Sequence, residues 1–403
     1  DMGKINSPTI MTITKEELAI NLKALQAHLF FGEGENNITQ NNLALLYEYS
    51  SLMQKNGLKN GNITVNTKDF ANFDIDLHVN DATLPLVEKG TPLKALDLKI
   101  QASKDMLKAH TPDNRIALRV QDNSTYIDLH SYDVIAQDSN ESSDTSLIVQ
   151  GYDSALVIKD LNRTILTDHY TITKKGEQLG LKAIYQEGNL SLSTNQDYLQ
   201  IEATNLDEKF VNTLAQKEIF HNGQFALNLY GSNTKNFSGT VHVDNSYLTD
   251  MRLYNNILSL INTLPALASF KGPDFNEKGY RIDSADILFS RIEDMVTFHA
   301  IDIDGTTADI IGKGTLNHAT DALNIELQLK TLKDVSNLIE KIPGVNYILL
   351  GEDKSISTAI TITGTLQKPK VNTHVLKDTV VTPFNILKRT IQLPFRLFTD
   401  EVK

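Results

Sequence analysis

Cysteine is absent from the 403-residue sequence. Its absence excludes disulfides, thiolate zinc sites and cysteine nucleophiles, although it does not fix the cellular compartment. Positive charge is also scarce, because 38 Lys and Arg residues stand against 50 Asp and Glu residues, a net charge of −12. Binding to nucleic acid requires clustered basic residues, so we expect no nucleic-acid partner.

Long apolar runs are missing as well. No uninterrupted stretch reaches the roughly 18 residues of a membrane-spanning helix, and the first residues lack the basic and then apolar pattern of a signal peptide. Because the first residue is Asp1 rather than Met, we expect an upstream segment, such as a membrane anchor, to precede it. A hydrophobic content of 40% with 22% charged residues is typical of a folded protein with a sizeable core.

Catalytic and metal-binding motifs are not found. The ten histidines form no His-x-x-x-His pair, and no Gly-x-Ser-x-Gly motif occurs. Asp302, Asp304 and Gly305 resemble the start of a calcium loop, but Lys313 stands where the closing acidic residue is required. We therefore expect a protein that is not an enzyme, with no catalytic residues, no metal and no cofactor.

The first sixty residues show helical spacing. Thr14 and Glu17 form a capping-box pattern, and a helical apolar stripe follows at Leu18, Leu22, Leu25 and Leu29. A second stripe runs from residue 43 to residue 53. The sequence predicts a helical N-terminal cap over residues 1–60.

From about Ile63 the apolar period changes to two, which is typical of strands with one dry and one wet face. The clearest alternation covers residues 96–102, 323–329 and 356–366. We count about twenty such segments joined by short turns, which together predict a long antiparallel meander. Short amphipathic helices are predicted near residues 207–220, 249–264 and 376–398.

The C-terminal segment combines basic and aromatic residues. From Lys368 onward seven basic residues stand against three acidic ones. A segment of this kind can lie in a membrane interface, although a helix packed on its own domain and a disordered tail are equal alternatives. The predicted membrane-contact residues are Phe384, Leu387, Lys388, Arg389, Leu393, Phe395, Arg396 and Phe398.

Residues 237–375 carry a series of family-like strand, turn and helix patterns. They include Phe237-Ser238-Gly239-Thr240-Val241-His242-Val243, the helix from Leu253 to Ile261, Gly312-Lys313-Gly314-Thr315-Leu316 and Lys368-Pro369-Lys370-Val371. This stretch resembles the C-terminal domain of the AsmA-like family, in its YhdP-like branch. None of these patterns is catalytic.

The resemblance implies a bridge-like lipid-transfer protein of the Gram-negative envelope. It implies a mainly β fold, a long curved antiparallel sheet of the repeating β-groove type with a few short amphipathic helices. The expected segments are a β-groove region at 61–205, which extends the strand alternation beyond the resemblance, an AsmA-like β region at 206–375 and an amphipathic C-terminal helix at 376–403. The expected groove residues are Leu96, Leu98, Ile100, Leu227, Leu229, Leu323, Ile325, Leu327, Ile360 and Ile362.

The expected partners are phospholipid or another acyl lipid, the inner and outer membrane surfaces, and envelope proteins. The expected location is the periplasm, with an inner-membrane tether formed by a helix that precedes Asp1. Two alternatives stay open. The chain could be a scaffold that assists outer-membrane assembly without moving lipid, or a carbohydrate- or ligand-binding sandwich whose dry face is filled by its own side chains.

Overall fold

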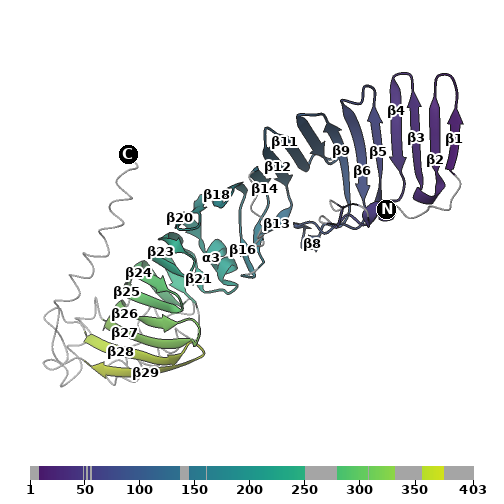
Figure 1. Ribbon diagram of the computed structural model, residues 1–403. Helices are drawn as coiled ribbons and strands as arrows, with labels where there is room; N and C mark the ends of the chain where they lie inside the picture. Colours follow the sequence, from purple (N-terminus) through teal and green to yellow (C-terminus); the bar gives the residue numbers. More distant parts are fainter. Residues whose placement is uncertain are drawn as a thin grey trace, which may run out of the picture. The chain divides into compact units, whose positions relative to one another are not determined.

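Strands dominate the computed structural model, which describes residues 9–48, 50, 53–54, 57–136, 145–159, 161–249, 279–306, 308–331 and 356–375. Twenty-four strands belong to one hydrogen-bonded sheet and five to a smaller one (Figure 1). The described residues hold only short helices: α1 (Ala44–Tyr47), α3 (Glu208–Ala215) and the 3-10 turn η1 (Lys23–Leu25). The predicted mainly β fold with an open, largely antiparallel sheet is confirmed.

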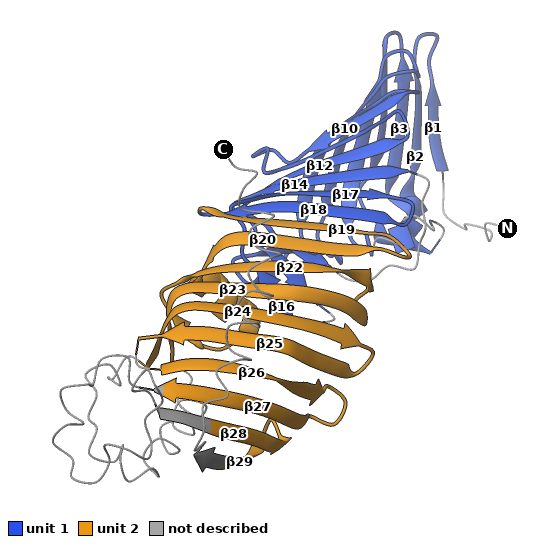
Figure 2. Ribbon diagram, turned by 90° about the vertical axis from the view of Figure 1, so that its left-hand side faces the viewer, with its two compact units in different colours: residues 1–186 blue, residues 187–403 orange. Residues whose placement is uncertain are grey.

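The chain divides into two compact units, residues 1–186 and 187–403 (Figure 2). The boundary predicted after residue 205 falls inside a strand of unit 2. In unit 1 the strands of the large sheet are β1 (Thr9–Ile13), β2 (Leu18–Leu22), β3 (Ala27–Gly32), β4 (Glu35–Gln40), β5 (Gly61–Thr67), β6 (Phe73–Val79), β9 (Leu96–Ala102), β10 (Met106–His110), β11 (Ile116–Gln121), β12 (Ser124–His130), β14 (Ser146–Tyr152), β17 (His169–Lys175) and β18 (Gln178–Tyr185).

A five-stranded sheet is built from the connections of unit 1. It contains β7 (Leu86–Glu88), β8 (Thr91–Pro92), β13 (Asp133–Ala136), β15 (Leu156–Ile158) and β16 (Arg163–Ile165). Because the chain visits this sheet between β12 and β14, those two strands pair in parallel, as do β13 and β15. These two pairs are exceptions to the predicted antiparallel meander.

Unit 2 is an antiparallel meander of longer strands (orange in Figure 2). Its strands are β19 (Gly188–Thr194), β20 (Leu199–Asp207), β21 (Phe220–His221), β22 (Gln224–Asn233), β23 (Asn236–Leu248), β24 (Tyr280–Ile292), β25 (Met295–Gly305), β26 (Ala308–Asn317), β27 (Ala322–Thr331), β28 (Ile356–Thr365) and β29 (Lys368–Val375). Helix α3 confirms part of the amphipathic helix predicted at 207–220, and the Asp207 side chain caps it by accepting a hydrogen bond from the Phe210 amide. The helix predicted at 249–264 lies outside the described residues.

The two long edges of each unit differ. Successive antiparallel strands turn back alternately at one edge and at the other. At one edge, which we call the tight-turn rim, most connections are hairpins of a few residues, such as 33–34, 122–123 and 176–177 in unit 1 and 234–235, 293–294 and 366–367 in unit 2. The other edge, which we call the insertion rim, carries η1, α1 and the five-stranded sheet in unit 1 and α3 in unit 2.

The helical N-terminal cap predicted over residues 1–60 is largely wrong, because strands β1 to β4 occupy most of its described residues. A spacing of four residues fits one helical turn, but it also fits two strand periods, so Leu18 and Leu22 share a face in either structure. The predicted capping contact does form, since the Glu17 amide donates to Thr14 Oγ1 at 3.0 Å, but it closes the turn between β1 and β2. Helix α1 confirms a short part of the second helix predicted in this region.

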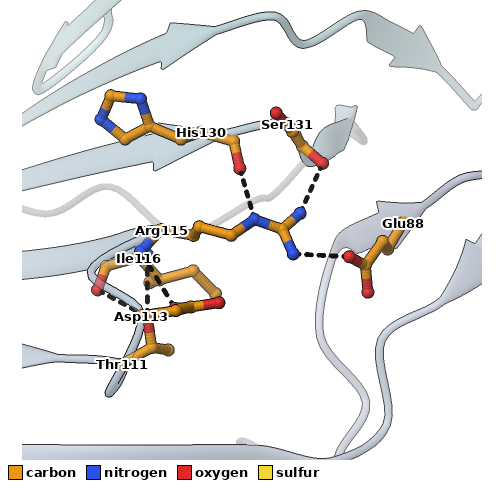
Figure 3. Close-up of polar contacts among 7 residues, drawn as sticks. All are labelled: Glu88, Thr111, Asp113, Arg115, Ile116, His130 and Ser131. Atoms are coloured by element: carbon orange, nitrogen blue, oxygen red, sulfur yellow. Dashed lines mark hydrogen bonds and ion pairs between the residues drawn. The ribbon is translucent and has the colours of Figure 1, made fainter.

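Arg115 joins the five-stranded sheet to the large sheet of unit 1 (Figure 3). Its Nη1 contacts the Glu88 carboxylate of β7 at 2.5 Å, and its other nitrogens donate to the backbone oxygens of His130 and Ser131. The guanidinium also lies 4.1 Å from the centroid of the Tyr132 ring. One side chain therefore holds three segments of the insertion rim together.

Arg115→Ala is expected to lower the free energy of unfolding of unit 1 by about 1–3 kcal/mol, because it leaves several polar groups without their charge-assisted partner. Arg115→Lys is expected to restore only part of this loss, because lysine lacks the planar fork that binds a carboxylate and two carbonyls at once. Denaturant unfolding of the three proteins measures both differences. A lysine variant as stable as the wild type would show that charge alone suffices.

Candidate functional site: an apolar face in each unit

In unit 1, an unbroken row of apolar side chains crosses the large sheet. Residues that lie directly opposite one another on neighbouring strands are apolar on all 13 strands. We call this row the unit 1 ladder: Met11, Ile20, Leu29, Ile38, Val65, Ile75, Ile100, Ala109, Leu118, Ile127, Val149, Ile172 and Leu181. A row that continues over every strand places all these apolar side chains on the same face of the sheet.

Unit 2 has two such rows side by side. The first ladder is Leu192, Ile201, Leu229, Gly239, Phe289, Phe298, Gly314, Ile325, Ile362 and Val371. The second ladder is Leu190, Ala203, Leu227, Val241, Ile287, Ile301, Gly312, Leu327 and Ile360. We call the face that carries the ladders the apolar face of each unit.

Glycines in the unit 2 ladders make room for larger neighbours. A Cβ atom on Gly239 would collide with the side chain of Leu229, and one on Gly314 would collide with the backbone of Ile325. These glycines therefore keep the rows apolar while they let the neighbouring side chain or strand approach closely. Gly312-Lys313-Gly314, which looks like a phosphate-loop fragment, lies within β26.

The ten predicted groove residues all lie on the apolar faces, three in unit 1 and seven in unit 2. Ile100 belongs to the unit 1 ladder, and Leu96 and Leu98 share its face of β9. In unit 2, Leu229, Ile325 and Ile362 belong to the first ladder, Leu227, Leu327 and Ile360 to the second, and Leu323 shares the face of β27. Nine of the ten are partly exposed, whereas Ile360 is buried at 3% exposure.

Sequence reasoning missed most of the ladder residues. Met11, Ile20 and Leu29 lie in the region assigned to helices, and the glycines of unit 2 carry no apolar signal of their own. The alternation of Leu18, Ile20 and Leu22 was the signal that could have found β2. All eight predicted membrane-contact residues, from Phe384 to Phe398, lie outside the described residues.

Exposure varies across the apolar face of unit 2. Most side chains in the row nearest the insertion rim are at most 6% exposed, whereas Ile303 of the same row is partly exposed. The buried members are Leu206, Phe225, Val243, Ala285, Ile310 and Leu329. The side chains of the first ladder, farther from that rim, are partly exposed. Apolar side chains that stay in contact with water on an otherwise well-ordered face offer a surface for an apolar ligand.

The opposite face of unit 2 carries a charged cluster around His242. Its Nδ1 lies 2.6 Å from Asp286 and its Nε2 lies 2.9 Å from Asp244. Asp286 in turn lies directly opposite Asp302, a like-charge pair that is unfavourable without a nearby cation. The hydrogen bond to Asp286, with further support from Asp244, raises the pKa of His242 to about 9, so the imidazolium stays charged at neutral pH.

This raised pKa predicts a loss of stability in alkaline solution. The folded pKa of about 9 exceeds that of a free histidine, near 6.5, so the contribution is fully present below about pH 6.5 and is lost as the pH rises through 9. His242→Gln is expected to lower the free energy of unfolding by about 2 kcal/mol at pH 6 and by less at pH 10. Chemical denaturation at both pH values checks this, and an equal loss at both would contradict it.

A hollow of about 560 Å³ lies on the polar face of unit 1, over β10, β11, β12 and β14. Its lining includes Lys108, Arg119, Tyr126, Asp128 and Gln150, and the Arg119 guanidinium lies 4.4 Å from the centroid of the Tyr126 ring. Ala117 and Ile148 also line the hollow, but the charged side chains of the lining would lose water if acyl chains filled it. The apolar faces are thus the better candidates for a lipid surface.

Within the described ranges, no three His, Asp or Glu side chains gather in a way that could hold a metal ion. Across the same ranges, no helix has the length and apolar character needed to cross a membrane.

The fold and its ladders define an open, largely antiparallel sheet protein with a continuous apolar face in each unit. Comparison with protein families agrees with this class, since residues 9–371 match the family model described as YhdP protein. The chain belongs to this family, which is of the AsmA-like, bridge-like lipid-transfer type found in the Gram-negative envelope. Searches of curated proteins and of solved structures found no match.

Proposed function

We propose that the chain is a non-enzymatic periplasmic protein that moves phospholipid between the inner and outer membranes, with the acyl chains held on its apolar faces. The unbroken register of the ladders carries this proposal. Every strand of the large sheet in unit 1 contributes an apolar residue to one row, and every strand of unit 2 except β21 contributes an apolar residue or a glycine to the first ladder. Membership of the YhdP family supports the same reading.

The energetics of lipid in water explain the need for such a face. A two-tailed lipid that crosses water exposes about 30 CH₂ groups at about 0.8 kcal/mol each. The resulting barrier of about 25 kcal/mol allows only about 10⁻⁶ crossings per second. At a strand spacing of about 4.8 Å, the unit 1 ladder alone extends about 60 Å, along which acyl chains would remain out of water.

A vesicle assay tests this function. The purified chain is added to donor vesicles that contain a fluorescent phospholipid and to acceptor vesicles without it. Transport predicts that transfer accelerates in proportion to protein concentration. Transfer at the spontaneous rate would contradict transport and favour the scaffold. A carbohydrate- or ligand-binding role predicts the same spontaneous rate together with a ligand in the polar hollow of unit 1.

A further inference from the structure

From β11 to β18, the apolar face of unit 1 is buried along one rim and exposed along the other. In β11 to β18, the row nearest the insertion rim is buried, with side chains between 0% and 8% exposed: Ile116, Leu129, Tyr170 and Ala183. In the same strands, Val120 and Leu179 lie on the apolar face near the tight-turn rim and are each 37% exposed. The barrier of packed side chains is therefore on the insertion side.

Further exposed apolar residues gather along the tight-turn rim of unit 1. Ile13 ends β1 next to the β1–β2 turn and is 70% exposed, and Phe70 in the β5–β6 turn is 58% exposed. The Phe70 ring lies 6.2 Å from that of Phe31, whose strand position is on the apolar face. Four large apolar side chains along one rim thus remain in contact with water, where an acyl chain can reach them without any rearrangement of the sheet.

A cation lies at the same rim. Lys174 shares the apolar-face side of β17 with Ile172 and lies directly opposite Leu179. Acidic side chains such as Glu177, in the β17–β18 turn, lie at the same rim, so the exposed apolar residues rather than the charge mark the path for acyl chains.

We infer that phospholipid acyl chains enter and leave the apolar face of unit 1 sideways, over the tight-turn rim, while the headgroup stays in water. This inference rests on the proposed function. The insertion rim offers no such path, because its buried row and the five-stranded sheet would have to open first.

Two matched pairs of exposed residues test the route. Leu179→Glu is compared with Leu161→Glu, because Leu161 is 65% exposed in the β15–β16 turn of the insertion rim. Ile13→Glu is compared with Ile184→Glu, because Ile184 is 45% exposed and lies on the polar face of β18. All four positions are exposed, so none of the substitutions removes a core side chain. If a variant of the first pair fails to fold, the second pair tests the route.

The delipidated full chain is mixed with phosphatidylglycerol vesicles, and the lipid bound per chain is followed over time after separation. The two rim variants are expected to load about tenfold more slowly, because a carboxylate in the path must lose water as an acyl chain passes. Their matched controls are expected to load at the wild-type rate. Equal rates within each pair would overturn the inference while the proposed function stands, whereas a wild-type chain that takes up no lipid would overturn both.

Discussion

Ile325→Asp is expected to lower the acyl lipid bound by unit 2 at least tenfold without unfolding it. Ile325 lies in the first ladder between Gly314 and Ile362, and its side chain is partly exposed. Without lipid the new carboxylate can remain hydrated, but an acyl chain on the ladder would strip its water at a cost of about 2 kcal/mol or more. A loss of 1.4 kcal/mol is already tenfold in affinity.

Asn324→Asp provides the matched control for Ile325→Asp. Asn324 is the preceding residue of β27, its side chain is on the other face and it is exposed, so the same charge is added without touching the ladder. Lipid extracted from each purified protein is quantified per chain, where the lipid held by unit 1 is common to all variants, and thermal unfolding verifies the fold. If both variants kept wild-type lipid, or both lost it equally, the ladder would not be the binding surface.

Tyr170→Ala is expected to destabilise unit 1 by about 3–5 kcal/mol, as other large aromatic truncations in cores do. Tyr170 is 0% exposed, and burial raises the pKa of its phenol, so it stays neutral. Its ring lies across Gly151 of β14, where a Cβ atom would collide with the ring. Gly151→Ala is therefore expected to cost about 1–3 kcal/mol through overpacking.

Tyr170→Phe separates the contribution of the ring to stability from that of its hydroxyl. The hydroxyl is buried and has no hydrogen-bond partner among the described residues, so its removal is expected to change stability by less than about 1 kcal/mol. Urea unfolding of Tyr170→Ala, Tyr170→Phe and Gly151→Ala measures all three. A Gly151→Ala protein as stable as the wild type would show that the ring can move aside.

Alternation predicted the strands well where one face is wet and the other dry. The segment from Leu96 to Ala102 is β9 as expected, and the strands at 323–329 and 356–366 are contained in or overlap β27 and β28. The prediction from the sequence failed at β2 and β3. Leucines four residues apart fit both the helical and the strand period, and Thr14 and Glu17 imitate a helix cap at a turn. The alternation of Leu18, Ile20 and Leu22 was the local signal that favours a strand, and the pairing of β1 with β2 stabilises it.

The individual groove residues could be chosen from the sequence, but their alignment could not. Phe289 and Phe298 become neighbours of Leu229 and Ile325 only through the register of β22 to β27, which includes bulges in β24 and β25. The parallel pair β12–β14 was also beyond prediction, because it follows from the detour through the five-stranded sheet. Register is a property of pairs of strands, and one strand does not reveal it.

The central claim is that the apolar faces hold acyl chains in the native protein. A photo-crosslinking amino acid at Phe289 or Phe298, in the first ladder, tests it most directly, with Tyr230 as an aromatic control that lies on the polar face and is 61% exposed. After irradiation in the cell envelope, mass spectrometry of the purified protein is expected to show lipid adducts at the two ladder positions and none at Tyr230. Absence of adducts at both ladder positions, or equal adducts at all three, would contradict the account.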